Sequence, residues 1–451
     1  MQKLSATPLH LPNGPKGRLL VGNLPQFSRD PLKFITDCVR QYGDVVRIHI
    51  GPRLSYMINH PDHIEYVLVT NNRNFIKDLS VRLPPFRWLL GQGLLTSSGD
   101  FWLRQRRLAQ PAFHRHRIAA YAETMAVYAE KMAASWRDGE TRDAHQEMMR
   151  LTLDIVSKTL FDADVGGHAN DVGAALEVVM DRLSSQGSLI RALDQYLPTP
   201  GTIRFRRATR RLDEIIYGII RQRRASGQDT GDLLSMLLHA QDEDGSRMTD
   251  RQLRDEAMTL FLAGHETTAL ALSWTWYLLS LHPDVEERLA EELRAALGGR
   301  RPGMEDLPNL PFADKIIKEA MRLFPPAWSI GREALQDCEI GGYHVPAGTQ
   351  VYMMQWTMHR DPRYFDNPEA FDPDRWTDEF IRQLPKYAYF PFGGGPRLCI
   401  GNSFAMMEAV LILATVAQKV RLTLAPNQTV TPWPSVTLRP RDGIRMVVSR
   451  R

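Results

Sequence analysis

The sequence predicts a mainly α-helical fold with a small β region. An apolar stretch from Thr249 to His282 has the length and composition of one long helix, and Thr249 and Gln252 are spaced as a capping box at its start. At about 1.5 Å per residue this helix is roughly 50 Å long, so it must be central to the fold. Several other stretches have apolar residues at helical spacing, whereas extended runs are few.

The remaining elements follow from local patterns. Two apolar runs, 45–50 and 54–58, are separated by Gly51-Pro52-Arg53 and predict an early β-hairpin. The last predicted helix stops at Pro325-Pro326, because proline cannot continue a helix. The predicted helices are 121–136, 151–160, 212–224, 284–297 and 312–324, and the predicted extended segments are 339–352 and 436–449.

Composition indicates one soluble globular domain over residues 1–451, with an irregular N-terminal arm at 1–30. No linker, repeat or low-complexity run divides the 451 residues, of which 43% are hydrophobic and 24% charged. A net charge of +4 gives no reason to expect nucleic-acid binding, and without an apolar run of about 18 residues we expect no transmembrane anchor. The three cysteines, Cys38, Cys338 and Cys399, lack metal or disulfide spacing and favour a reducing, cytoplasmic compartment.

Cys399 lies in the most informative segment, the glycine-rich loop Phe392–Gly401. Glycines allow backbone conformations closed to other residues, Arg397 supplies a nearby positive charge, and Phe392 could shield the sulfur from water. A thiol has a pKa of about 8.5, and such surroundings help to keep it deprotonated as a metal ligand. The alternative is an ordinary β-hairpin around a buried, inert cysteine.

A second motif, Ala263-Gly264-His265-Glu266-Thr267-Thr268, lies in the middle of the long helix. Small residues there let the helix lie close to a flat partner, and Glu266 and Thr267 place a carboxylate and a hydroxyl, two groups that can transfer protons, side by side. The segment also begins like a zinc-protease H-E-x-x-H, but position 269 is alanine, so the second zinc ligand is missing. The alternative is a threonine bonded back to its own helix and a glutamate in a buried pair.

Two further motifs complete a pattern in fixed order. Glu319-x-x-Arg322 places two opposite charges on one helical face, and Phe371–Trp376 follows with Arg375 inside it. Together with the Cys loop, the mid-helix motif and Trp102-x-x-x-Arg106, these motifs resemble the cytochrome P450 family of haem-thiolate monooxygenases over nearly the whole chain. The resemblance implies the P450 fold, with haem b between the long helix and the Cys loop with its following helix.

The resemblance also implies roles for individual residues. Cys399 is the expected iron ligand, Thr267 and Glu266 are the expected catalytic pair, and Arg375 joins Glu319 and Arg322 in a structural triad. Arginine is the natural partner of the haem propionates. The expected cofactor-binding residues are Trp102, Arg106, Ala263, Gly264, Arg332, Phe392, Gly395, Arg397 and Gly401, and the expected substrate-pocket residues are Phe86, Trp88, Phe261, Leu262, Ala327, Trp328, Ile330 and Val436.

The implied reaction inserts one atom of O2 into a hydrophobic substrate by hydroxylation or epoxidation. The pocket residues are mostly apolar or aromatic, and the chain resembles the fatty-acid and carotenoid hydroxylating branches, with a terpenoid as a further candidate substrate. Since no reductase is fused, electrons should come from NAD(P)H through a ferredoxin or flavodoxin-type donor and its reductase. The alternatives are a peroxide-driven peroxygenase or a non-oxygenating isomerase of the same fold, or a haem-binding sensor or carrier without turnover.

Overall fold

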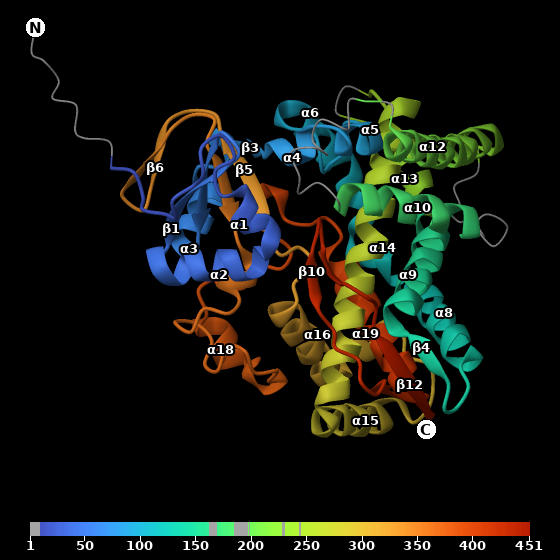
Figure 1. Ribbon diagram of the computed structural model, residues 1–451. Helices are drawn as coiled ribbons and strands as arrows, with labels where there is room; N and C mark the ends of the chain where they lie inside the picture. Colours follow the sequence, from blue (N-terminus) through green and yellow to red (C-terminus); the bar gives the residue numbers. More distant parts are fainter. Residues whose placement is uncertain (1–9, 162–168, 185–196, 198, 228–230, 243–244) are drawn as a thin grey trace, which may run out of the picture. The chain divides into compact units, whose positions relative to one another are not determined.

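The computed structural model describes residues 10–161, 169–184, 197, 199–227, 231–242 and 245–451, and these form two compact units (Figure 1). Unit 1 consists of Met1–Leu83, Ala327–Ala370 and Ile381–Cys399, and unit 2 of Pro84–Pro326, Phe371–Phe380 and Ile400–Arg451. The expected mainly α-helical class with a small β region is confirmed. The expectation of a single domain stays a prediction.

Unit 1 is built around a five-stranded sheet of strand order β1-β2-β8-β5-β3. β2 and β8 pair in parallel and the other pairs are antiparallel, and the predicted hairpin is confirmed as β1 and β2. Figure 1 shows these blue and orange strands side by side, although about 250 residues separate β3 from β5 along the sequence. The strands are β1 (Val45–Ile50), β2 (Arg53–Ile58), β3 (Phe75–Lys77), β5 (Ile330–Ala334) and β8 (Gln350–Met353).

Short helices and a second hairpin complete unit 1. They are α1 (Leu24–Arg29), α2 (Pro31–Tyr42), α3 (Pro61–Glu65), the π-helical turn η1 (Tyr66–Thr70), η2 (Asn72–Asn74), α4 (Leu79–Arg82), β6 (Cys338–Ile340), β7 (Tyr343–Val345), α17 (Gln355–Met358) and η7 (Gly395–Arg397). The expectation of an irregular arm through residue 30 is wrong at α1, where a proline in the first turn is compatible with a helix because its missing N–H would be unpaired there anyway.

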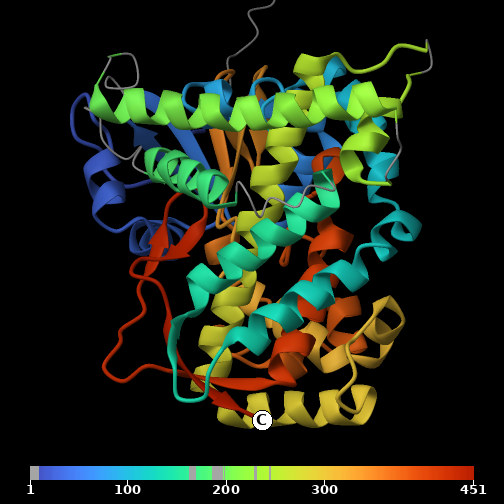
Figure 2. The ribbon, with the colours of Figure 1, turned by 90° about the vertical axis from the view of Figure 1, so that its right-hand side faces the viewer.

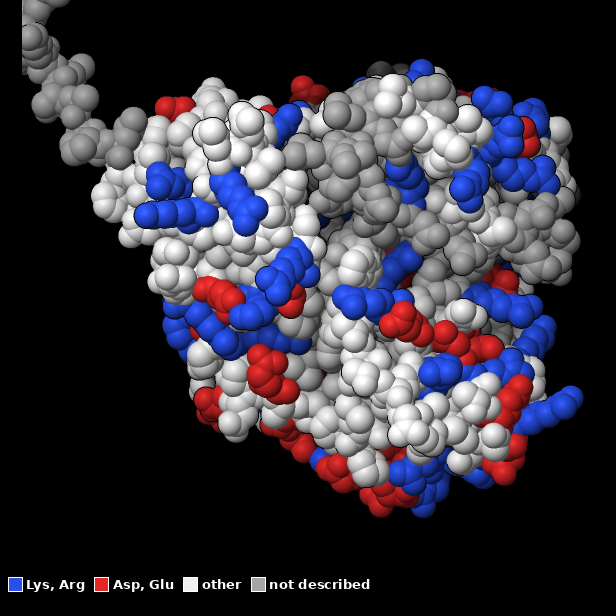
Figure 3. Space-filling view, viewed as in Figure 1, with Lys and Arg blue, Asp and Glu red and all other residues white. Residues whose placement is uncertain are grey.

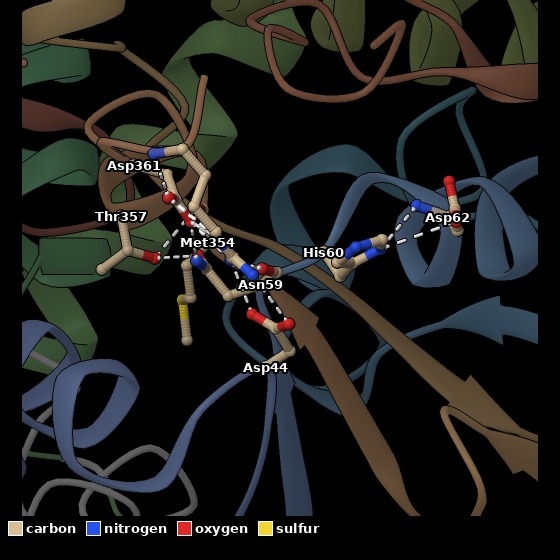
Figure 4. Close-up of polar contacts among 8 residues, drawn as sticks. Asp44, Asn59, His60, Asp62, Met354, Thr357 and Asp361 are labelled. Atoms are coloured by element: carbon tan, nitrogen blue, oxygen red, sulfur yellow. Dashed lines mark hydrogen bonds and ion pairs between the residues drawn. The ribbon is translucent and has the colours of Figure 1, made fainter. Parts of the chain in front are cut away.

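A buried polar network ties β2 to the segment that follows β8. Asn59 donates to Asp361 (3.1 Å) and accepts a hydrogen bond from the Thr357 hydroxyl (2.7 Å), as Figure 4 shows. Arg363 then joins Asp361 to Asp44, with 2.9 Å between its Nη1 atom and the Asp44 carboxylate. Since buried polar groups cost free energy unless they are paired, this network specifies how residues about 300 positions apart meet.

Unit 2 is helical and is organised around α14 (Asp250–Leu281), the long helix that the sequence predicts. The capping box between Thr249 and Gln252 is confirmed. α9 (Ala144–Phe161) and α16 (Pro311–Leu323) pack against α14, and Trp274 stacks on Phe324 with ring centroids 4.2 Å apart. The other helices are α5 (Phe86–Leu90), α6 (Gly99–Ala109), η3 (Gln110–Phe113), α7 (Arg115–Ala119), α8 (Ala122–Ser135), α10 (Ala169–Ser184), α12 (Pro200–Ser226), α13 (Leu233–His239), α15 (Pro283–Leu297), η5 (Met304–Asn309), η6 (Pro373–Arg375) and α19 (Asn402–Ala417).

Two small sheets belong to unit 2. Strands β4, β12 and β9 form one antiparallel sheet, and β10 and β11 form the other. The short helix α18 (Asp378–Gln383) begins in unit 2 and ends in unit 1. The predicted extended segment 436–449 is therefore two strands separated by a turn. The bounds are β4 (Thr141–Asp143), β9 (Val420–Leu424), β10 (Pro432–Pro434), β11 (Leu438–Pro440) and β12 (Arg445–Arg450).

Candidate active site

The glycine-rich loop that carries Cys399 is held tightly within unit 1. The Cys399 N–H donates to the Phe392 carbonyl (3.0 Å). Gly395 has φ +63°, and a Cβ atom there would lie 1.9 Å from the Leu68 carbonyl oxygen. Only glycine fits so close to η1. The alternative of a β-hairpin around a buried cysteine is wrong, since residues 384–401 contain no strand and Cys399 is exposed.

Three basic side chains of unit 1 form a cationic cluster. Lys77 and Arg332 are opposite each other in the β3–β5 pairing, and Arg332 is only 4% exposed. Burial lowers the pKa of Arg332 to about 10, and burial together with the nearby Arg332 charge lowers that of Arg397 to about 9. The pKa of Lys77 falls well below its usual range because of burial first and then the charges of both arginines.

Such a cluster is costly because each charge is removed from water and repels its neighbours. Asp78 lies close to Arg332 and Lys77 and partly offsets the cost, but its carboxylate also accepts the Ser80 N–H (3.0 Å) at the start of α4. One carboxylate near three cations leaves the cluster suited to a further anionic group. The sequence indicated Arg332 and Arg397 through the resemblance, whereas it gave no signal for Lys77.

In unit 2, the buried middle of α14 has one opening. Between Leu253 and Trp276 every residue is buried except Ala263, Gly264 and Thr267, which lie on one face of the helix. The Thr267 hydroxyl donates to the Ala263 carbonyl (2.7 Å), and a Cβ atom on Gly264 would lie 3.3 Å from a Val156 methyl group. The helix therefore presents two small residues and one hydroxyl at this opening, as the sequence predicts.

Glu266 is turned away from that opening toward the segment before and within β11. Its carboxylate accepts hydrogen bonds from the Thr437 hydroxyl (2.6 Å) and from Nε of Arg439 (2.8 Å). Burial lowers the pKa of the nearby His145 and His265 to about 4, so both rings are neutral at pH 7. A carboxylate paired in this way must first leave Arg439 before it can exchange a proton with Thr267. The sequence carries no local signal for Thr437 or Arg439, since they are about 170 residues from Glu266.

The expected triad of Glu319, Arg322 and Arg375 is assembled in unit 2. Both Glu319 and Arg322 are 0% exposed, and Arg322 donates to the Glu319 carboxylate through Nε (2.9 Å) and Nη2 (2.7 Å). Arg375 Nε donates to the same carboxylate (2.9 Å), and Trp376 Nε1 adds a fourth bond at 2.9 Å that the sequence did not indicate. The Asp372 backbone N–H donates a fifth bond (3.0 Å). Five donors compensate the burial of one carboxylate, which fits a structural role.

Trp102 and Arg106, expected near the cofactor, lie four residues apart on α6 in unit 2. Trp102 is buried and Arg106 half-buried. Arg332 and Arg397 belong to unit 1, where they lie close to Lys77. Gly401 belongs to unit 2 and lies beside Phe113, whose ring would be 3.7 Å from a Cβ atom there.

The expected substrate-pocket residues divide between the two units. Phe86, Phe261 and Leu262 belong to one apolar cluster of unit 2, with Trp88 packed against it. Val436 is exposed, in the same unit. Ala327, Trp328 and Ile330 lie in unit 1, where Ile330 packs on its apolar core and the buried Trp328 stacks on Phe27 at 6.4 Å. The Phe27 contact favours a packing role for Trp328.

The comparisons with known proteins agree with these features. The sequence model of the family described as Cytochrome P450 matches residues 12–446. The chain belongs to the cytochrome P450 family. Cyclooctat-9-en-7-ol 5-monooxygenase of Streptomyces melanosporofaciens is 38% identical over 91% of this chain and 89% of that protein, and pentalenene oxygenase of Streptomyces avermitilis is 36% identical over 96% of both. A cyanobacterial P450 structure with bound retinoic acid, CYP120A1, superposes with a TM-score of 0.89 at 26% identity, covering 99% of this chain and 100% of that one.

Membership establishes this chain as a haem-dependent P450 monooxygenase with the P450 fold. Each unit has residues of the kinds that bind haem. In unit 1 Cys399 is exposed and a partly buried cationic cluster can receive carboxylates, and in unit 2 α14 is open beside Ala263 and Gly264. Monooxygenation also requires an organic substrate and an electron-donating partner. In the part of the chain that the structure describes, we find no helix with the length and hydropathy needed to cross a membrane.

Proposed function

We propose that this P450 hydroxylates or epoxidises a hydrophobic, terpenoid-like molecule with haem b as its cofactor. Support for the substrate class comes from the apolar cluster around Phe86, Phe261 and Leu262 and from the relatives whose names specify pentalenene and cyclooctat-9-en-7-ol. An alcohol or alkene substrate with few polar groups matches a pocket wall with few polar side chains. Fatty acids and carotenoids are the competing substrate classes.

In this proposal each site residue has one task. The Cys399 thiolate would hold the iron, and Lys77, Arg332 and Arg397 would hold the propionates, since their mutual repulsion favours an anionic partner. When bound, haem with a thiolate ligand supplies the chemistry that activates dioxygen. Ala263 and Gly264 would leave room for the cofactor beside α14, and the Thr267 hydroxyl, which donates to the Ala263 carbonyl, would turn to hand on a proton at Oγ1.

Glu266 has a more restricted part in this proposal than the motif alone suggests. Its bonds to Thr437 and Arg439 keep the carboxylate on the far side of the helix from the opening, so it acts only after a side-chain rotation. The acid and alcohol pair favours dioxygen over peroxide as the oxidant. A ferredoxin or flavodoxin-type donor with its own reductase is the proposed source of electrons, and the cytoplasmic location expected from the cysteines remains a prediction.

The observation that carries the proposal is the exposed Cys399 in the same loop as Arg397 of the cationic cluster. The first experiment is the visible spectrum of the dithionite-reduced protein under carbon monoxide. We expect a strongly red-shifted Soret band for the wild type and for Cys338→Ser, and its loss in Cys399→Ser. A Cys399→Ser variant that keeps the red-shifted band removes the ligand assignment.

The substrate class is tested separately on protein that passes the spectral test. The oxidised protein is titrated with three sets of compounds: cyclic terpene hydrocarbons and alcohols, long-chain fatty acids, and carotenoids. A shift of the Soret band reports that the compound has bound and displaced a water molecule from the iron. We expect saturable shifts with the terpenoid set. Saturation by fatty acids alone would reassign the substrate, and turnover with peroxide but not with NADPH and a surrogate reductase would reassign the oxidant.

A further inference from the structure

The outward face of α12 is an extended row of arginines. This 27-residue helix packs one side against α10 and α14, and its opposite side is exposed (Figure 2). Taking 100° per residue, the exposed arginines fall within one half of the helix circumference. The members of this arginine face are Arg204, Arg206, Arg207, Arg210, Arg211, Arg221 and Arg224.

Few acidic groups oppose this charge. Of the two acidic residues on α12, Asp213 pairs with the buried Arg254, whereas Glu214 is exposed and lies 3.6 Å from Arg211. Arg224 pairs with Asp250 at 2.8 Å. Among the residues that the structure describes, the other five arginines of the face have no ion pair. Figure 3 shows basic side chains gathered over α12.

The arrangement does not stabilise the helix. Like charges three or four residues apart on a helix repel, as Arg207 does with Arg204, Arg210 and Arg211, and each such pair is unfavourable by a few tenths of a kcal/mol. A helix face that is only exposed to water would keep the protein soluble equally well with a mixture of positive and negative charges. From Arg204 to Arg224 the arginines extend over about 30 Å of the helix, and Glu214 is the one exposed acidic residue of α12 among them. This long, predominantly cationic surface fits an extended anionic surface rather than a small ligand.

Apolar groups beside the arginines identify the kind of surface. Leu197 is 55% exposed just before α12, and Ile203 in its first turn is 39% exposed. The Arg206 guanidinium lies over the Trp88 ring at 4.6 Å, which connects the face to the apolar cluster of the proposed substrate pocket. Arginine at a membrane interface places its stem in the apolar layer and its charge among the headgroups.

We propose that the arginine face of α12 binds the surface of an anionic lipid bilayer. Leu197 and Ile203 enter the headgroup layer while the guanidinium groups pair with lipid phosphates. Its use to the enzyme rests on the proposed function, since a hydrophobic substrate concentrates in the bilayer beside Trp88. The binding itself does not depend on which substrate is correct.

The test is co-sedimentation of the haem-loaded protein with vesicles. One set contains phosphatidylcholine with about one-third phosphatidylglycerol, and the other contains phosphatidylcholine alone. Arg207→Gln/Arg210→Gln/Arg221→Gln removes three charges from the face. The matched control, Arg137→Gln/Arg382→Gln/Arg445→Gln, removes three exposed arginines elsewhere.

We expect the wild type and the control to bind anionic vesicles, to release them at high salt, and to ignore neutral vesicles. At about a fivefold change in affinity per arginine, the face variant should bind roughly a hundredfold more weakly. Equal binding of the two variants, or of the two vesicle types, overturns the proposal, as does salt-sensitive binding to DNA or to an acidic protein but not to vesicles. An unchanged carbon-monoxide spectrum in every variant separates this outcome from failure of the proposed function.

Discussion

Glu408 allows a prediction about stability that follows from burial alone. It lies in α19, where every residue from Met407 to Ala417 is buried, and its own side chain is 0% exposed. Neither carboxyl oxygen has a hydrogen bond to any described group, although the neighbouring Thr268 hydroxyl, which donates to the Gly264 carbonyl (3.2 Å), slightly offsets the effect of burial. Burial raises the pKa of Glu408 from its ordinary value of 4.5 to about 8, so the folded protein holds it mainly as the neutral acid at pH 7.

The pH dependence follows from the two pKa values of Glu408. Between pH 4.5 and 8 the unfolded chain has lost the proton that the folded chain keeps, so unfolding releases a proton. The free energy of unfolding therefore has its full value below pH 4.5 and falls as pH rises toward 8. One proton corresponds to on the order of 1 kcal/mol per pH unit.

Glu408→Gln has nearly the same shape and cannot ionise. Denaturant unfolding of haem-loaded wild type and variant at pH 5.5, 6.5 and 7.5 should show the variant gaining on the wild type by about 1 kcal/mol per pH unit. Glu291→Gln, which changes an exposed glutamate of α15, is the control and should show no such trend. Parallel pH profiles for the Glu408 variant and the wild type would refute the assignment of a neutral buried acid.

Three other predictions concern the active site. Thr267→Ala should divert electrons from product to hydrogen peroxide by roughly tenfold or more, with Thr267→Ser as the conservative control, and unchanged coupling would remove the proton-transfer role. Glu319→Gln should lower the free energy of unfolding by about 3–5 kcal/mol and reduce haem loading, because two arginines lose their buried partner; a well-loaded, stable but inactive variant would indicate a catalytic role instead. Lys77→Gln should release haem to an apoprotein acceptor about tenfold faster if Lys77 pairs with a propionate, whereas Lys131→Gln at an exposed site should not, and equal release rates would exclude Lys77 from the site.

The sequence predicts the parts of this molecule that depend on nearby residues. The capping box at Thr249 and the opening at Ala263–Thr267 follow from spacing along one helix, and the Glu319–Arg322 pair from two positions one turn apart. Contacts between segments that are distant in the sequence depend on how the chain packs, and residue spacing does not predict them. The pairing of Glu266 with Arg439 and the approach of Lys77 to Arg397 join elements with no shared local pattern.

The order of segments in the two units has a consequence for synthesis on the ribosome. β2 ends at Ile58 and its parallel partner β8 begins at Gln350, so at 5–20 residues per second β2 waits about 15–60 s for that partner. Both units are completed late, since the last segment of unit 1 ends at Cys399 and unit 2 needs β12 at Arg445–Arg450. During that wait the apolar face of the early hairpin is unprotected, and we expect nascent chains to depend on chaperones until β8 has emerged from the ribosome.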